Sequence, residues 1–102
     1  MLELRPACEN CGRRLPPSAA DARICSFECT FCADCVDRVL ENVCPNCGGG
    51  FCPRPVRPAR ELKPGQHLGA HPASTAIRHR PVDRAGHAAF AAEVRSIPPH
   101  ER

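Results

Sequence analysis

Residues 25–47 read CSFECTFCADCVDRVLENVCPNC and contain six of the nine cysteines of the chain. Two more, Cys8 and Cys11, lie upstream with two residues between them, and Cys52 is the ninth. Two cysteines so spaced can present both sulfurs to one tetrahedral ion, with Zn–S bonds of ~2.3 Å. The first eight cysteines therefore form four ligand pairs, which are enough for two complete four-sulfur zinc sites.

The segment between the last two pairs decides which pairs share an ion. Its large apolar residues recur at i, i+3, i+4 and i+7, which predicts a helix over residues 33–43: Val36, Val39, Leu40 and Val43. At ~1.5 Å per residue, a helix would separate these pairs by about 12 Å, too far for both to converge on one ion. An interleaved cross-brace is therefore predicted. One Zn²⁺ is assigned to Cys8, Cys11, Cys32 and Cys35, and the other to Cys25, Cys29, Cys44 and Cys47.

Ahead of this helix, residues 23–31 read RICSFECTF. Their β-branched and aromatic content predicts a short β-hairpin that turns at residues 26–28. We expect Ile24, Phe27 and Phe31 to join the apolar face of the helix in a small core framed by the two ions.

The composition indicates that the fold needs bound metal or disulfide bonds for its stability. The 102 residues include twelve prolines, four phenylalanines and no tryptophan or tyrosine, so little large apolar surface is available for a core. The chain starts without the basic and apolar regions of an export signal, and no apolar run is long enough to span a membrane. We therefore expect a cytoplasmic protein whose paired cysteines bind metal rather than form disulfides. Closed four-thiolate sites favour zinc; the alternatives are a single metallated site, or iron in place of zinc.

Two resemblances follow from these motifs. The stretch FCADC at residues 31–35, a short helix and CPNC at residues 44–47 resemble the second half of a RING-type zinc finger. More closely, MLELRP at residues 1–6, ICSFECTFCADC at residues 24–35 and VCPNCGGGF at residues 43–51 resemble a bacterial family known as domain of unknown function 1272. That resemblance spans about residues 1–58 and implies a short cysteine-rich protein without an assigned activity. The expected fold is a small metal-stabilised α+β, RING-like cross-brace with two four-cysteine zinc sites, one hairpin and one short helix.

RING fingers commonly recruit ubiquitin-conjugating enzymes, but the residues found here oppose that function. Such fingers usually carry an aliphatic residue just before the second cysteine and a cation soon after the eighth. This chain has Asn10 and three glycines, residues 48–50, at those places. Ligase activity is therefore not expected, because a fold resemblance alone does not transfer function.

The second half of the chain differs from the first in charge and composition. Residues 1–52 carry five basic and seven acidic side chains, whereas residues 53–102 carry nine and four. We divide the chain into a two-zinc module at residues 1–52, a Pro/Arg-rich extended linker at residues 53–66 and a low-order, mostly disordered tail at residues 67–102. Cations recur at every third residue of the linker, the period of polyproline II, and would form a basic edge for an anionic partner: Arg54, Arg57, Arg60 and Lys63. The plainer interpretation is a solvated linker.

The last residues carry weaker signals. All five histidines lie there, and His67 and His71 are four residues apart, but Gly69 and Pro72 oppose a helix, so only adventitious metal binding is expected. Asp83 is expected to cap a short helix at about residues 84–96. The sequence is compatible with this helix folding on a partner, packing on the zinc module or staying unfolded.

These observations point to a binding protein rather than an enzyme. No catalytic triad, carboxylate pair, phosphate-binding glycine loop or three-ligand metal site is visible in residues 1–52. The sequence predicts a non-enzymatic zinc-binding module that acts as a protein-interaction or scaffold protein, with no membrane and no small-molecule substrate. The alternatives are a nucleic-acid-binding zinc finger that uses the basic tail, and a thiol redox or zinc-release sensor. Cys52 is expected to be a small apolar residue beside Phe51, with a reactive thiol or a substitute ligand as alternatives.

Overall fold

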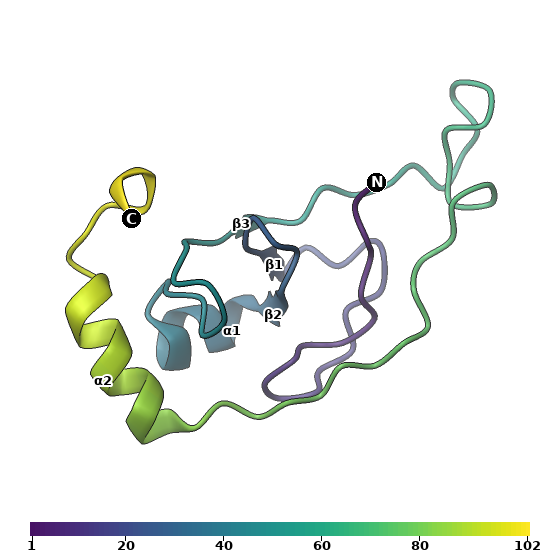
Figure 1. The fold of residues 1–102 in the computed structure, drawn as a ribbon. Coiled ribbons are helices and arrows are strands. Elements are labelled where there is room, and N and C mark those ends of the chain that lie inside the picture. The colour runs from purple at the N-terminus through teal and green to yellow at the C-terminus, as the bar shows by residue number, and fades with distance from the viewer.

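In the computed structural model, which describes residues 1–102, a β-hairpin lies at the centre of the molecule, where the sequence predicted one (Figure 1). Strand β1 (Ala22–Ile24) pairs antiparallel with β2 (Thr30–Cys32), and Arg23 lies opposite Phe31. The chain reverses through Glu28, which has a left-handed φ of 66°. Cys25 and Cys29 flank this turn, and the Cys25 N–H bonds to the Cys29 carbonyl at 3.2 Å.

A third strand, β3 (Cys52–Pro53), pairs with the other edge of β1, so that the sheet order is β2-β1-β3. Cys52 lies opposite Ile24 in this pairing. The sequence did not predict β3, because two residues that include a proline carry no strand pattern, and proline cannot donate to a strand ladder. This pairing connects the last residues of the cysteine-rich half to β1, the central strand of the sheet.

One short helix follows the hairpin directly. It consists of α1 (Ala33–Cys35) and a π-helical turn, η1 (Val36–Leu40). The helix ends three residues before the predicted limit, because Glu41 and Asn42 both adopt left-handed backbone conformations, with φ of 53° and 57°. Val36, Leu40 and Val43 of the predicted apolar face are buried, as the periodicity indicated.

The core is made of cysteines and a few aliphatic and aromatic side chains. Phe31 is 1 % exposed and packs edge-to-face on Phe51, with ring centroids 5.5 Å apart. The expectation that Phe27 joins this core was wrong, since Phe27 lies at the tip of the hairpin turn and is 70 % exposed. We call residues 1–53, which contain the sheet, the short helix and all cysteines, the head.

The predicted disorder of the second half was also wrong. Residues after 53 run back across the head in extended form, and turns around residues 60–70 project away from it (Figure 1). Backbone donors of this returning segment bond to carbonyls of the head: Ser74 N–H to Leu4 at 3.0 Å and Arg80 N–H to Glu9 at 2.7 Å. Composition does not reveal such backbone pairing, which is why the sequence indicated a low-order tail.

Helix α2 (Arg84–Val94) lies within the range where the sequence placed a possible helix, and a short 3₁₀ turn, η2 (Pro99–Glu101), follows it. Figure 1 shows α2 beside the helix formed by α1 and η1. Two residues of α2 are buried, His87 and Ala91. No helix of the molecule has both the length and the apolar character needed to cross a membrane.

Candidate metal centres

Four sulfur atoms from two distant parts of the chain converge at the first candidate centre. The Sγ atoms of Cys8, Cys11, Cys32 and Cys35 all lie within 4.8 Å of one another. The Cys11 and Cys32 sulfurs are 3.8 Å apart. A regular tetrahedron with Zn–S bonds of ~2.3 Å has edges of about 3.8 Å. The donor set and its spacing therefore fit a tetrahedral metal ion, and these four are the residues that the sequence assigned to one ion.

A tight turn, residues 8–12, supplies two of these sulfurs, and we call it the first knuckle. Gly12 N–H bonds to the Cys8 carbonyl at 3.0 Å, and Gly12 has a φ of 79°, which favours glycine. The backbone N–H of Cys11 points at the Cys8 sulfur at 3.5 Å. The other two sulfurs come from the last residue of β2 and the last residue of α1, so the strand-to-helix junction fixes their separation.

The second candidate centre is built on the same plan. The sulfurs of Cys25, Cys44 and Cys47 lie within 4.8 Å of one another. Cys29, the fourth residue that the sequence assigned here, is not within that distance of all three, but its carbonyl accepts from the Cys25 N–H at 3.2 Å and its sulfur accepts from the Asn46 side-chain amide at 3.4 Å. This centre thus gathers three sulfurs closely and the fourth beside them.

The second knuckle, residues 44–48, repeats the glycine hydrogen bond of the first, but a different N–H points at its first sulfur. Gly48 N–H bonds to the Cys44 carbonyl at 2.8 Å, and the φ of Gly48 is 77°. Asn46 N–H points at the Cys44 sulfur at 3.4 Å. Donation of N–H groups to sulfur stabilises the thiolate form that binds metal.

Burial makes these sulfurs dependent on a cation. Desolvation raises the pKa of the Cys35 and Cys44 thiols strongly, and it raises those of Cys29 and Cys32 as well. At Cys11 desolvation also acts to raise the pKa, but the Arg13 backbone N–H and neighbouring thiols outweigh it, so the pKa is lowered. Adjacent thiolates, most of them buried, repel one another, and a divalent ion is the group that offsets this charge.

Two asparagines complete the centres, and the sequence analysis did not identify their role. Asn10 donates its side-chain amide to the Cys35 sulfur at 3.2 Å, and Asn46 donates to the Cys29 sulfur at 3.4 Å. Each asparagine reaches from a knuckle to the other cysteine pair of the same centre. The signal that could have revealed them is the repeat Cys-x-Asn-Cys-Gly at residues 8–12 and 44–48.

The predicted basic edge is not an open one. Arg54 is 4 % exposed, and its guanidinium bonds to the carbonyls of Leu15 and Pro16 at 3.1 and 3.0 Å. Arg57 is also engaged, since it donates to the His71 and Leu2 carbonyls at 2.7 Å each. In the structure both guanidiniums instead hold the returning chain to the head.

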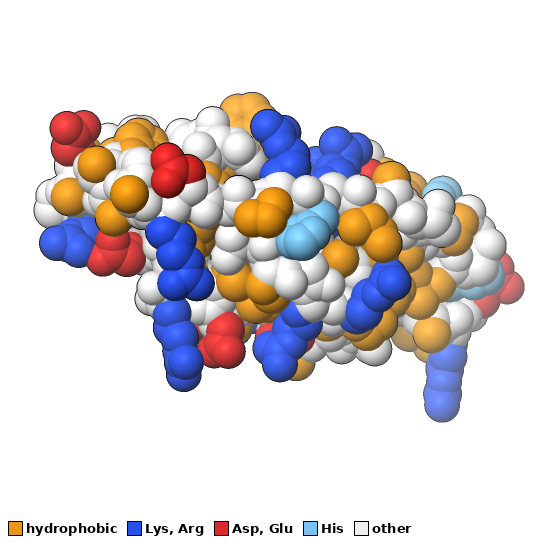
Figure 2. Space-filling view, turned by 90° about the horizontal axis from the view of Figure 1, so that it is seen from below, with side chains coloured by type: hydrophobic (Ala, Val, Ile, Leu, Met, Phe, Trp, Pro, Cys, Tyr) orange, Lys and Arg blue, Asp and Glu red, His pale blue; other side chains and the backbone are white.

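Arg60 and Lys63 remain exposed. On the face that Figure 2 shows, arginine and lysine side chains are separated by apolar, uncharged and acidic groups. Such scattered cations do not form the continuous track that follows a phosphate backbone.

The remaining candidate residues lie apart from the metal centres. Cys52 is exposed on β3 and belongs to neither group of close sulfurs. His67 pairs with Glu61 at 3.2 Å and is not part of a group of potential metal ligands, nor is His71.

Comparison with known proteins identifies the family of this chain, whose description assigns no activity. A family model described as a protein of unknown function, DUF1272, matches residues 1–57. An uncharacterized protein of Rhizobium meliloti (strain 1021) is 58 % identical over 76 residues, which cover 74 % of this chain and 83 % of that protein. The aligned length exceeds the family match, so the similarity extends past residue 57. No solved structure matches the chain.

Proposed function

This chain belongs to the DUF1272 family, whose description assigns no activity, and we propose from its own residues that it is a non-enzymatic protein-interaction module shaped by two structural zinc ions. The observation that carries the proposal is the convergence of two interleaved groups of cysteine sulfurs on either side of one short helix. The order of the pairs along the chain gives a RING-like cross-brace.

Zinc suits the donor set better than other common metals. Four thiolates in a tetrahedron are typical of structural Zn²⁺, and closed sites of this kind hold the ion without an open position for substrate or water. The ligands must be reduced thiols, and all nine cysteines of the structure are free of disulfide bonds. Four sulfurs at the first centre, and three at the second with Cys29 beside them, can fill the coordination sphere of each ion, which supports a role for the ions in the fold rather than in a reaction.

The proposed partner is a protein other than a ubiquitin-conjugating enzyme. At the position where RING fingers usually present an aliphatic docking residue, Asn10 instead turns its amide to the Cys35 sulfur. Nucleic acid is the weaker alternative, because Arg54 and Arg57 are used inside the molecule. If nucleic acid were the ligand, its affinity would fall steeply as salt is raised.

The test is native mass spectrometry of the full chain, expressed without added metal. We expect two zinc ions per chain, and we expect exhaustive chelation to abolish the dispersed amide NMR spectrum, since the core is too small to persist alone. A chain that carries no stoichiometric metal, or that stays folded after chelation, would contradict the proposal.

One observation favours a second candidate, a thiol redox or zinc-release sensor. Each group of close sulfurs includes one exposed cysteine, Cys11 in the first and Cys47 in the second. Exposed metal-bound thiolates are open to oxidants. A peroxide titration separates the candidates: a sensor releases zinc while the fold persists, whereas an interaction module releases zinc only as it unfolds.

A further inference from the structure

Helix α2 covers one face of the head, between η1 and the second knuckle. His87 is 5 % exposed and donates its Nε2–H to the Leu40 carbonyl at 2.9 Å, and Ala91 is fully buried one turn later. Phe90 packs against Gly48, where a Cβ atom would lie 3.2 Å from the ring. The face of the head under α2 therefore offers the Leu40 carbonyl as a hydrogen-bond acceptor and a close-packed contact at Gly48.

This face presents several backbone acceptors and one carboxylate. Besides the Leu40 carbonyl at the end of η1, it presents the Glu41 carboxylate, which pairs with Arg95. The carbonyls of Asn42 and Gly48 accept from Arg102 at 2.8 and 3.1 Å. An occupant that excludes water from these carbonyls must supply donors in its place, and a cation pairs with the Glu41 carboxylate, because a buried carbonyl without a donor is costly.

The residues of α2 that meet this face form a simple pattern. His87, Ala91 and Arg95 are spaced at i, i+4 and i+8 and so lie along one side of the helix. They provide, in order, a hydrogen-bond donor, a small side chain for close approach and a cation. This is a short recognition pattern that a helix of another protein can carry.

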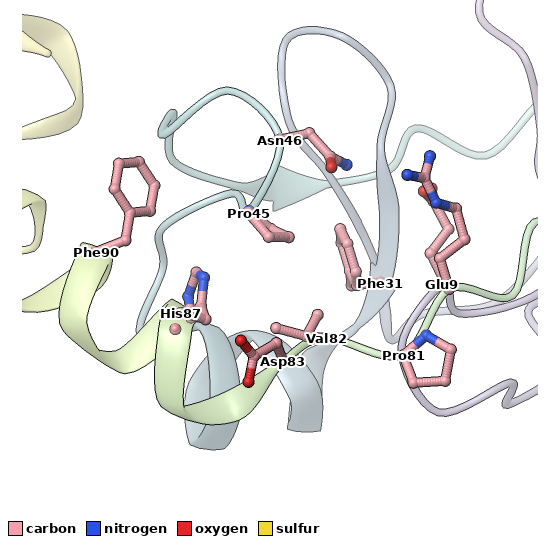
Figure 3. A pocket seen from close by; sticks show the side chains of 11 residues that line it. Glu9, Phe31, Pro45, Asn46, Pro81, Val82, Asp83, His87 and Phe90 are labelled. Atoms are coloured by element: carbon pink, nitrogen blue, oxygen red, sulfur yellow. The ribbon is translucent and has the colours of Figure 1, made fainter.

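Helix α2 does not fill the groove. A cavity of about 320 Å³ remains between it and the head, with His87 and Phe90 on one side and Phe31, Pro45 and Asn46 on the other (Figure 3). The helix is also weak by itself: it has eleven residues, it includes Gly86, and Asp83 at its start makes no side-chain capping bond. A weak helix in a groove that it fills only partly can be displaced.

We infer that this groove on the head, formed by η1, Glu41, Asn42 and the second knuckle, is a docking site for a cationic amphipathic helix of a protein partner, and that α2 is its internal competitor. The inference rests on the proposed interaction function and names its surface and its class of partner. A partner helix that carries the same donor, small residue and cation, with a bulkier side chain over the cavity, replaces α2.

The test uses the full chain with α2 prevented from docking. Ala91→Arg places a long charged side chain at a fully buried position, whereas Ala89→Arg places it on the exposed side of the same helix and serves as the control. The probe is a fluorescent synthetic peptide of residues 82–102, followed by anisotropy. Because the docked helix reduces the fraction of free grooves, we expect the Ala91→Arg chain to bind the peptide about tenfold more tightly than the wild type or the control. An Arg95→Glu peptide should bind about tenfold more weakly, the effect of ~1.4 kcal/mol.

Metal content, measured on every variant, separates this inference from the function on which it rests. If the Ala91→Arg chain holds two zinc ions but does not bind the peptide, or if all three proteins bind it equally, the docking site is disproved and the zinc module stands. If the wild type holds no metal, the proposed function itself fails.

A second measurement tests the same inference on the wild type, so it applies even if the Ala91→Arg chain does not fold. In hydrogen exchange of the wild type, the α2 amides should exchange at least ~100-fold faster than the Cys44 amide, which bonds to the Gly49 carbonyl at 2.8 Å within the second knuckle. Equal protection would mean that α2 leaves the head only when the whole protein unfolds, and this would overturn the inference.

Discussion

The side-chain amide of Asn10 lies 3.2 Å from the Cys35 sulfur and so links the two cysteine pairs of the first metal centre. Asn46 makes the equivalent link to Cys29 in the second centre at 3.4 Å. An N–H donor offsets negative charge on a thiolate and fixes its direction, as ligand-supporting groups do in other metal sites. The two centres are therefore matched in their supporting hydrogen bonds as well as in their cysteines.

Replacing either asparagine should weaken only its own centre. We expect Asn10→Ala to lower the metal affinity of the first centre by about tenfold, and Asn46→Ala to do the same to the second. Competition with a chromophoric chelator measures the affinities, and ¹¹³Cd NMR of the cadmium-loaded protein shows which centre changes. Each variant is the control for the other.

A second substitution of Asn10 tests the same hydrogen bond more directly. Asn10→Asp puts a carboxylate beside the thiolates and should weaken binding further than Asn10→Ala, because like charges repel. Equal affinities for the wild type, the alanine variant and the aspartate variant would show that the amide does not support the metal centre.

Features that depend on residues close together in the sequence were predicted better than features that depend on residues far apart. The hairpin and the short helix follow from residue patterns within about ten positions, and the grouping of sulfurs follows from the length of the helix between Cys35 and Cys44. The hydrogen bonds of the two asparagines could also have been predicted, because Asn10 and Asn46 occupy the same position in a repeated motif.

The rest was not predictable from local patterns. The returning chain is held by backbone and guanidinium hydrogen bonds to carbonyls, and any residue type provides those carbonyls. Ser74 N–H, for example, bonds to the backbone carbonyl of Leu4 at 3.0 Å, and the Arg57 guanidinium donates to the carbonyl of Leu2. A proline-rich composition indicates disorder when such distant acceptors are not considered.

Cys47 and Cys52 allow a direct test of ligand assignment, because both are exposed and lie five residues apart. Only Cys47 belongs to a group of close sulfurs. We expect Cys52→Ser to retain two zinc ions with unchanged stability, and Cys47→Ser to lose one ion, as measured by native mass spectrometry. Loss of an ion from the Cys52→Ser chain would instead make Cys52 a ligand.

Gly12 should be required for metal binding because of its backbone conformation. Its φ of 79° is costly for any residue with a Cβ atom, by roughly 1–2 kcal/mol for alanine. We expect Gly12→Ala to lower the affinity of the first centre by about tenfold. Gly65 is a matched control, since its φ is 75° but it lies in a turn away from the sulfurs. Gly65→Ala should leave metal affinity unchanged, and equal effects of the two substitutions would contradict this account.

Arg54 should be the side chain beyond the metal ligands on which the fold depends most. Its guanidinium is buried and donates to three carbonyls, those of Arg5 at 2.8 Å, Leu15 at 3.1 Å and Pro16 at 3.0 Å, so it joins the end of the head to its first twenty residues. Burial lowers the pKa of Arg54, but arginine stays charged, and no carboxylate lies among these three bonded acceptors.

Arg54→Lys keeps the charge but removes the planar fork, so at least one buried carbonyl is left without a donor. We expect a loss of about 2–3 kcal/mol in the free energy of unfolding, measured by urea denaturation with zinc in excess. The control is Arg60→Lys at an exposed position, which should change stability by less than about 0.5 kcal/mol. If the two variants unfold at the same urea concentration, the carbonyls around Arg54 are satisfied by other means and the guanidinium does not hold the returning chain.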